Sequence, residues 1–186
     1  MASSHPDHHW RCVLFLSLAA LGCAADLLTK SWVFQWRGMP TPNNEWWIWE
    51  GVLGIETAIN TGALFGMGQG QVFFFATVSF LAIGGILYWV FLGHVTRDLL
   101  VTVALGLILG GILGNLYDWL GFWGQYGVRD WILIRYRSFT WPNFNIADSL
   151  LVVGAGILMW HAYREGRPAA EPSGSDVSVK AESSAN

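Results

Sequence analysis

Two long uncharged apolar stretches constrain the fold of this chain more than any other feature of its sequence. Residues 72–93 and residues 99–117 contain no Asp, Glu, Lys or Arg. Each stretch is long enough to cross a hydrocarbon core of about 30 Å as a helix. Only a short link separates them, so we expect an antiparallel pair of membrane-spanning helices.

Two further apolar stretches carry a few charged residues. Residues 12–36 are apolar apart from Asp26 and Lys30, and residues 146–163 are apolar apart from Asp148 and His161. Both are long enough to span a membrane. With the two uncharged stretches they predict four transmembrane helices.

The first of these stretches also has features of a cleaved signal segment. Arg11 precedes it, and Ala20-Leu21-Gly22-Cys23 resembles a lipobox with its first two positions inverted. The apolar pattern continues past Cys23 through Leu27, Leu28 and Trp32. We therefore favour a retained first span over a cleaved signal.

The composition supports a membrane protein. Apolar residues make up 53% of the chain and charged residues only 12%, against roughly 25% charged in soluble domains. Ten Lys and Arg against thirteen Asp and Glu leave no basic excess for binding nucleic acid. The predicted fold class is an α-helical integral membrane protein with four transmembrane helices.

The segments outside the spans divide into a structured loop and two ends. Between spans one and two, residues 45–50 and 52–59 predict short strands or extended segments, so we expect a small β-rich sheet there. The tryptophans of this loop suit a membrane interface or an aromatic sheet face, and both can hold. We expect residues 1–11 to form an N-terminal segment, residues 12–163 the membrane domain, and residues 164–186 a disordered tail.

Ionisable residues in or beside membrane spans are costly, so each is a functional hypothesis. Asp26 and Lys30 lie four residues apart on one helix face, which favours an ion pair. That pair either anchors the first span or binds the head group of a ligand. In the third span, Gly106, Gly110 and Gly114 recur at a spacing of four residues, which predicts close approach of a neighbouring helix. Gly111, Asn115 and Asp118 share one face of the same span, and they act either as polar contacts between helices or as part of a site.

A pair of carboxylates is the catalytic chemistry that this chain has available. Two carboxylates held together share one proton, so the ionised partner activates water while the protonated partner donates to a carbonyl. This chemistry requires neither a metal nor a cofactor, and we expect none. From the residues alone, Asp148 pairs equally well with Asp118 or with Asp130.

Five motifs, in order along the chain, resemble the lipoprotein signal peptidase (signal peptidase II) family. The sequence reads D-L-L-T-K at 26–30, N-T-G-A-L-F at 60–65, G-G-I-L-G-N-L-Y-D at 110–118, V-R-D-W-I at 128–132 and F-N-I-A-D at 144–148. Each motif alone is weak. Their common order on four predicted spans makes the resemblance specific.

The resemblance implies a membrane aspartic endopeptidase. It would cleave prolipoproteins before a diacylglyceryl-modified cysteine, with Asp130 and Asp148 as the catalytic pair. The supporting or substrate-binding residues it implies are Asp26, Lys30, Asn60, Gly62, Ala63, Gly111, Asn115, Asp118, Asn145 and Ala147.

The same resemblance implies where the protein resides and what it contacts. The location would be the bacterial inner membrane, with both termini cytoplasmic and the sheet extracytoplasmic. With Lys30 of the first span included, the ten Lys and Arg residues divide evenly between the two sides, so charge alone does not set this orientation. The expected partners are prolipoproteins and membrane lipids, with no nucleic acid, and the protein would be a monomer.

Three departures from the family pattern leave other functions open. Trp119 and Ile59 occupy positions where the family usually has arginine, and the spacing from Asp118 to Asp130 is longer than usual. Arg129, or the later Arg135 and Arg137, are the residues that would compensate. The alternatives are an inactive homologue or membrane scaffold, and a proton-coupled transporter.

Overall fold

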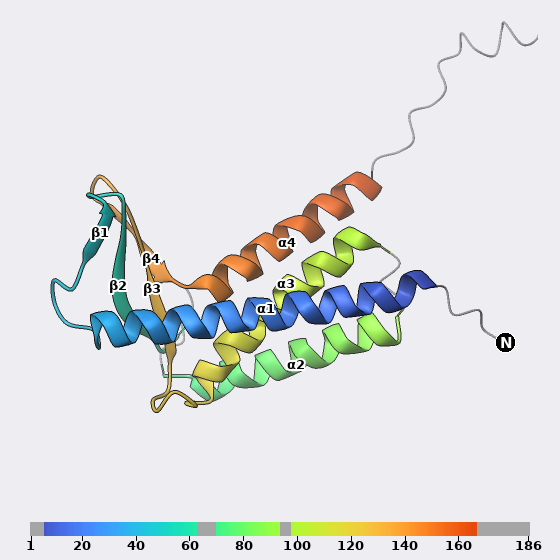
Figure 1. The fold of residues 1–186 in the computed structure, drawn as a ribbon, viewed down its shortest axis with the longest axis horizontal. Coiled ribbons are helices and arrows are strands. Elements are labelled where there is room, and N and C mark those ends of the chain that lie inside the picture. Colours follow the sequence, from blue (N-terminus) through green and yellow to red (C-terminus); the bar gives the residue numbers. More distant parts are fainter. Residues whose placement is uncertain (1–5, 63–69, 94–97, 167–186) are drawn as a thin grey trace, which may run out of the picture.

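The computed structural model describes residues 6–62, 70–93 and 98–166. Four helices form an elongated bundle, and a sheet lies at one end of it (Figure 1). The start of the first helix and the end of the last lie at the opposite end. The helices are α1 (Pro6–Arg37), α2 (Val72–Phe91), α3 (Leu99–Trp119) and α4 (Ile146–Glu165). All four are long and apolar enough to cross a membrane, which confirms the predicted spans.

Helix α1 is longer than the span predicted from the sequence. It begins at Pro6, because proline at the first helical position gives up a backbone N–H that would have no helical partner. It ends at Arg37, and Gly38 follows with a φ of 78°. Glycine adopts this left-handed conformation without the strain that a Cβ brings, so it stops the helix there.

The sheet consists of two hairpins from different parts of the chain. Its strand order is β1-β2-β3-β4 and its neighbouring strands are antiparallel. The predicted strands between spans one and two are β1 (Trp46–Trp49) and β2 (Leu53–Asn60). The second hairpin, β3 (Val128–Tyr136) and β4 (Phe139–Phe144), connects α3 to α4.

The apolar run after Asp130 forms part of strand β3. This is an inner strand of the sheet, in which Asp130 pairs with Ala58 of β2. Val128 and Leu133 are buried, and β-branched and aromatic side chains suit a pleated, half-buried surface.

Aromatic residues join the sheet to the first helix. Trp36, near the end of α1, stacks on Trp32 with ring centroids 5.5 Å apart. It also meets Trp46 of β1 edge to face at 5.2 Å. All three rings are more than two-fifths exposed, which suits the boundary between lipid and water.

Helix α3 is the centre of the bundle, because its small residues allow close approach on two sides. A Cβ on Gly110 would lie 3.0 Å from the carbonyl oxygen of Ala19 in α1. A Cβ on Gly111 would lie 2.6 Å from the carbonyl oxygen of Ala147 in α4. The glycines of this helix therefore allow the close helix packing that their spacing predicts.

We expect Gly154→Ala to destabilise the contact between α3 and α4. A Cβ at Gly154 would lie 2.5 Å from a side-chain carbon of Ile108 and 2.8 Å from the carbonyl oxygen of Ala104. Overpacking of this kind costs about 1–3 kcal/mol. The melting temperature of the purified protein in detergent is therefore expected to fall.

Gly156→Ala is the matched control on the same helix. A Cβ at Gly156 has no atom within 4 Å, and alanine is the better helix former. Its melting temperature is expected to stay the same or to rise. Equal losses for the two variants would contradict the close packing of α4 on α3 at Gly154.

Candidate active site

Polar residues from four elements meet where the bundle joins the sheet. Asp130 lies near the start of β3, and Asn60 is the last residue of β2. Asn145 precedes α4, and Asp148 lies in its first turn. Asn115 comes from α3. Asn145, Asp130 and Asn115 are joined in one network of hydrogen bonds.

The start of α4 is held by a reciprocal pair of hydrogen bonds. The side-chain oxygen of Asn145 accepts from the backbone N–H of Asp148 at 2.9 Å. The carboxylate of Asp148 accepts from the backbone N–H of Asn145 at 3.2 Å. This capping box satisfies two backbone donors at the helix start. It also fixes the position of the Asp148 side chain.

Two asparagine amides each donate to one carboxylate. The oxygen of Asn145 already accepts from α4, so its Nδ2 faces Asp130 and donates to Oδ1 at 2.6 Å. The oxygen of Asn115 accepts from Lys30 Nζ at 2.9 Å, so its Nδ2 donates to Asp148 Oδ1 at 2.8 Å. Because an ammonium group only donates, Lys30 determines which way the amide of Asn115 turns.

Burial changes the acidity of Asp130. Desolvation, with the negative charge of Asp148 as the second cause, raises the pKa of Asp130 from 3.8 to about 8. The hydrogen bond from Asn145 opposes this rise and is smaller. Asp130 therefore holds a proton at neutral pH, which is the state that a general acid needs.

A second cluster of charges lies beside this pair. Lys30 Nζ is 2.6 Å from Asp26 Oδ2, which confirms the ion pair predicted within the first span, and 3.3 Å from Asp118 Oδ2. All three side chains are fully buried. The other oxygen of Asp26 accepts from the backbone N–H of Ala147 at 2.9 Å. This cluster connects α1, α3 and α4 directly beneath the site.

Arg129 completes the second cluster. Its guanidinium donates to Asp118 through Nη2 at 2.8 Å and Nε at 3.2 Å, and its backbone N–H donates to the same carboxylate at 2.9 Å. It also donates to Ser31 and lies over the ring of Trp123. Among the residues the sequence offered as compensation, Arg129 is therefore the one that pairs with Asp118. In the sequence, the only indication of this role was the position of Arg129 directly before Asp130.

The two positions that depart from the family pattern have different surroundings. Trp119 stacks on Phe75 with ring centroids 5.1 Å apart, and both line a cavity. Ile59 lines the same cavity. Arg135 donates to Glu45 and Arg137 lies over the ring of Tyr136, so neither takes part in the Asp118 cluster.

The remaining predicted residues have packing or turn contacts. Asn60 accepts from the backbone N–H of Gly62 at 3.0 Å, which shapes the turn that leaves β2. Gly111 and Ala147 are buried where α3 and α4 touch. Ala63 lies outside the described residues.

A cavity of about 990 Å³ opens beside the two carboxylates. Its walls come from the sheet, from Phe75 of α2, from α3 and from the first two turns of α4. Neither Asp118, Asp26 nor Lys30 lines it. In the described ranges, no group of three His, Cys, Asp or Glu side chains is arranged to hold a metal. The lining residues that bear on function are Glu56, Ile59, Asn60, Asn115, Trp119, Asp130, Asn143, Asp148 and Val152.

The fold and the site define this chain as a multi-pass membrane enzyme of the aspartic type. The chain belongs to the signal peptidase (SPase) II family, whose pattern it matches over residues 18–164.

Relatives and solved structures agree with this assignment. A lipoprotein signal peptidase of Rhodopirellula baltica is 49% identical over 82% of this chain and 73% of its own length. That of Symbiobacterium thermophilum is 37% identical over 80% and 93%. A bacterial membrane enzyme solved by the in meso method shares the fold, with a TM-score of 0.73, 22% identity and coverage of 86% of this chain and 93% of its own.

Proposed function

We propose that this chain removes the signal peptide of prolipoproteins by cutting before a diacylglyceryl-modified cysteine. Its membership of the signal peptidase II family and the name shared by its relatives support this activity. One geometric observation carries the assignment of the catalytic pair. Asn145 contacts Asp130 through its side chain and Asp148 through its backbone, so both carboxylates meet at one cavity.

We assign the general base to Asp148 and the general acid to Asp130. Asp148 accepts hydrogen bonds on both oxygens, from Asn115 and from Asn145, as an ionised carboxylate does. Each oxygen keeps a second lone pair, so a water molecule can also donate to it. Asp130, with a pKa of about 8, holds the proton that the first step transfers to the carbonyl oxygen.

In this reaction Asp148 takes a proton from water while the water oxygen attacks the carbonyl carbon before the cysteine. Asp130 gives its proton to the carbonyl oxygen, and a tetrahedral diol forms. Asp148 then protonates the cysteine nitrogen, the carbon–nitrogen bond breaks, and Asp130 recovers a proton from the diol. The products are a signal peptide with a free carboxyl end and a lipidated cysteine with a free amino group.

Cleavage of a diacylglyceryl-modified prolipoprotein by the purified protein in detergent tests this function. Mass spectrometry is expected to find a product that begins at the modified cysteine. The unlipidated precursor serves as the control substrate. Absence of any cleavage by the folded protein would refute the proposal in favour of an inactive homologue or scaffold, and proton uptake by vesicles containing it would favour the transporter.

The activity is expected to fall as the pH rises through about 8. Asp130 must be protonated to donate, and its pKa is raised to about 8, so each further pH unit removes about nine-tenths of the active form. The measurement is kcat/KM between pH 6 and pH 10, with melting temperatures taken at each pH. A rate that rises through pH 8 while the protein stays folded would contradict the role of Asp130.

The same function includes an orientation in the membrane. We place both termini in the cytoplasm and the sheet on the outer side of the inner membrane, with residues 12–163 as the membrane domain and residues 1–11 and 164–186 as cytoplasmic ends. The protein acts as a monomer whose exposed apolar helix faces contact lipid. A reporter that is active only in the cytoplasm is expected to be active when fused to either end.

A further inference from the structure

The acidic and basic side chains that line the cavity in the described part of the chain are all acidic. Among the described lining residues, Glu56, Asp130 and Asp148 carry carboxyl groups, and none is Lys, Arg or His. Asp130 and Asp148 belong to the catalytic pair. Glu56 has no part in that chemistry, so its charge on the cavity wall needs another explanation.

A neighbouring side chain of the sheet holds Glu56 in place, but no cation of the described residues forms a salt bridge with its carboxylate. Asn143 donates to its carboxylate and to its backbone carbonyl, both at 3.0 Å. The described residues form no salt bridge with it. The negative charge of Glu56 acts on Arg135. The guanidinium of Arg135, however, donates its hydrogen bonds to the carboxylate of Glu45, with nitrogen–oxygen distances of 2.5 and 3.1 Å.

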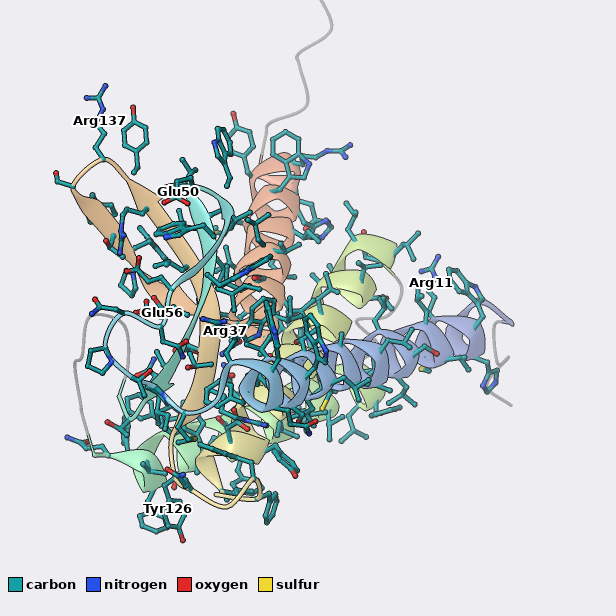
Figure 2. The ribbon with its side chains drawn as sticks, turned by 60° about the vertical axis from the view of Figure 1, so that its left-hand side comes forward. Arg11, Arg37, Glu50, Glu56, Tyr126 and Arg137 are labelled. Carbon is teal, nitrogen blue, oxygen red and sulfur yellow. The ribbon has the colours of Figure 1, made fainter. Side chains whose placement is uncertain are left out.

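The register of the sheet gives the distance between Glu56 and the catalytic pair. Ala58 pairs with Asp130, and Glu56 precedes Ala58 by two residues, at an irregularity in the register between Ile55 and Ala58. Two residues of extended strand span at most about 7 Å. In Figure 2, Glu56 is drawn between Arg137, at the tip of the sheet, and Arg37, at the end of α1. Glu56 therefore stands on the path that leads from the catalytic pair away from the bundle.

A substrate must follow that path in one direction. The signal peptide and the lipid on the cysteine are apolar and stay in the bilayer, so the chain after the cysteine leaves toward water along the sheet. An extended chain advances about 3.3 Å per residue. The two residues that follow the cysteine thus come beside the carboxylate of Glu56.

We propose that Glu56 selects substrates by charge, favouring Lys or Arg at the two positions after the modified cysteine and disfavouring Asp or Glu there. The inference rests on the proposed function and adds a substrate preference to it. The carboxylate attracts a cation in a partly desolvated cavity, where a charge pair is stronger than in bulk water. It repels an acidic side chain at the same place.

The test compares three lipidated substrates that differ only at these two positions, with Lys, Gln or Glu. The wild-type protein is expected to cleave the Lys substrate about tenfold faster than the Glu substrate in kcat/KM. The ratio is expected to shrink in 0.5 M salt, which screens charge. Glu56→Gln, which keeps the oxygen that accepts from Asn143, is expected to bring the ratio near one, and Glu56→Lys to invert it.

Glu50→Gln is the matched control, because Glu50 is an exposed carboxylate at the turn after β1 that does not line the cavity. This variant is expected to keep the wild-type ratio. Equal rates for the three substrates with wild-type protein, or a ratio unchanged by Glu56→Gln, would overturn the role of Glu56 and leave the peptidase standing. Failure to cleave even the Gln substrate would overturn both.

Discussion

Asp130→Asn is expected to abolish cleavage and yet to make the protein more resistant to heat at alkaline pH. The amide keeps an oxygen for the hydrogen bond from Asn145 but has no acidic proton to donate. Loss of a general acid or base lowers kcat by about 10³-fold. The measurement is kcat on the lipidated precursor, together with melting temperatures in detergent.

The sign of the stability effect follows from the raised pKa of Asp130. That pKa is about 8 in the folded protein, against an ordinary value of 3.8. Between these pH values the folded protein holds a proton that the unfolded chain has released, so the free energy of unfolding falls as the pH rises toward 8. Asparagine cannot ionise, so the variant avoids this loss.

Two further variants separate catalysis from structure. Asp148→Asn is expected to be as inactive as Asp130→Asn. Asp118→Asn is the matched control, because its carboxylate binds Arg129 and Lys30 and does not line the cavity. It is expected to melt at a lower temperature, with cleavage by the molecules that remain folded. An inactive Asp118→Asn protein of unchanged stability would reverse the assignment of roles.

Lys30→Met is expected to cause a larger loss of stability than Gly154→Ala or Asp118→Asn. Lys30 is fully buried and lies within salt-bridge distance of both Asp26 and Asp118. Removing it leaves carboxylate charge without its partner in the interior, which costs about 3–5 kcal/mol. The measurement is the melting temperature of the purified protein, with the yield of folded protein as a second readout.

A double substitution tests the electrostatic cause of that loss. Lys30→Met combined with Asp26→Asn removes one cation and one carboxylate together, so it is expected to recover part of the stability lost in Lys30→Met. Arg135→Gln is the comparison, because its ion pair with Glu45 is partly exposed and exposed pairs contribute little. If the double variant were no more stable than Lys30→Met, lost packing would be the cause.

The local sequence patterns predicted a large part of this protein. Apolar length determined the four spans, because a helix must cover the whole hydrocarbon core. The four-residue spacing of Asp26 and Lys30 determined their ion pair, and the glycines of the third span determined its close packing. Each of these features depends on residues within one or two helical turns, so a short window of sequence contains it.

Residue types left open which carboxylate lies beside Asp148; the family resemblance implied Asp130, and the tertiary structure brings Asp130 to the cavity. By residue type, Asp118 and Asp130 were equal candidates. The pairing of β3 with β2 places Asp130 opposite Ala58 at the cavity wall. Asp118 instead accepts hydrogen bonds from Arg129 in the neighbouring charged cluster. Strand register depends on contacts between residues far apart in the chain, and a shift of one residue would turn Asp130 to the other face. No local sequence pattern predicts this register. None predicts that Glu56 lines the cavity either.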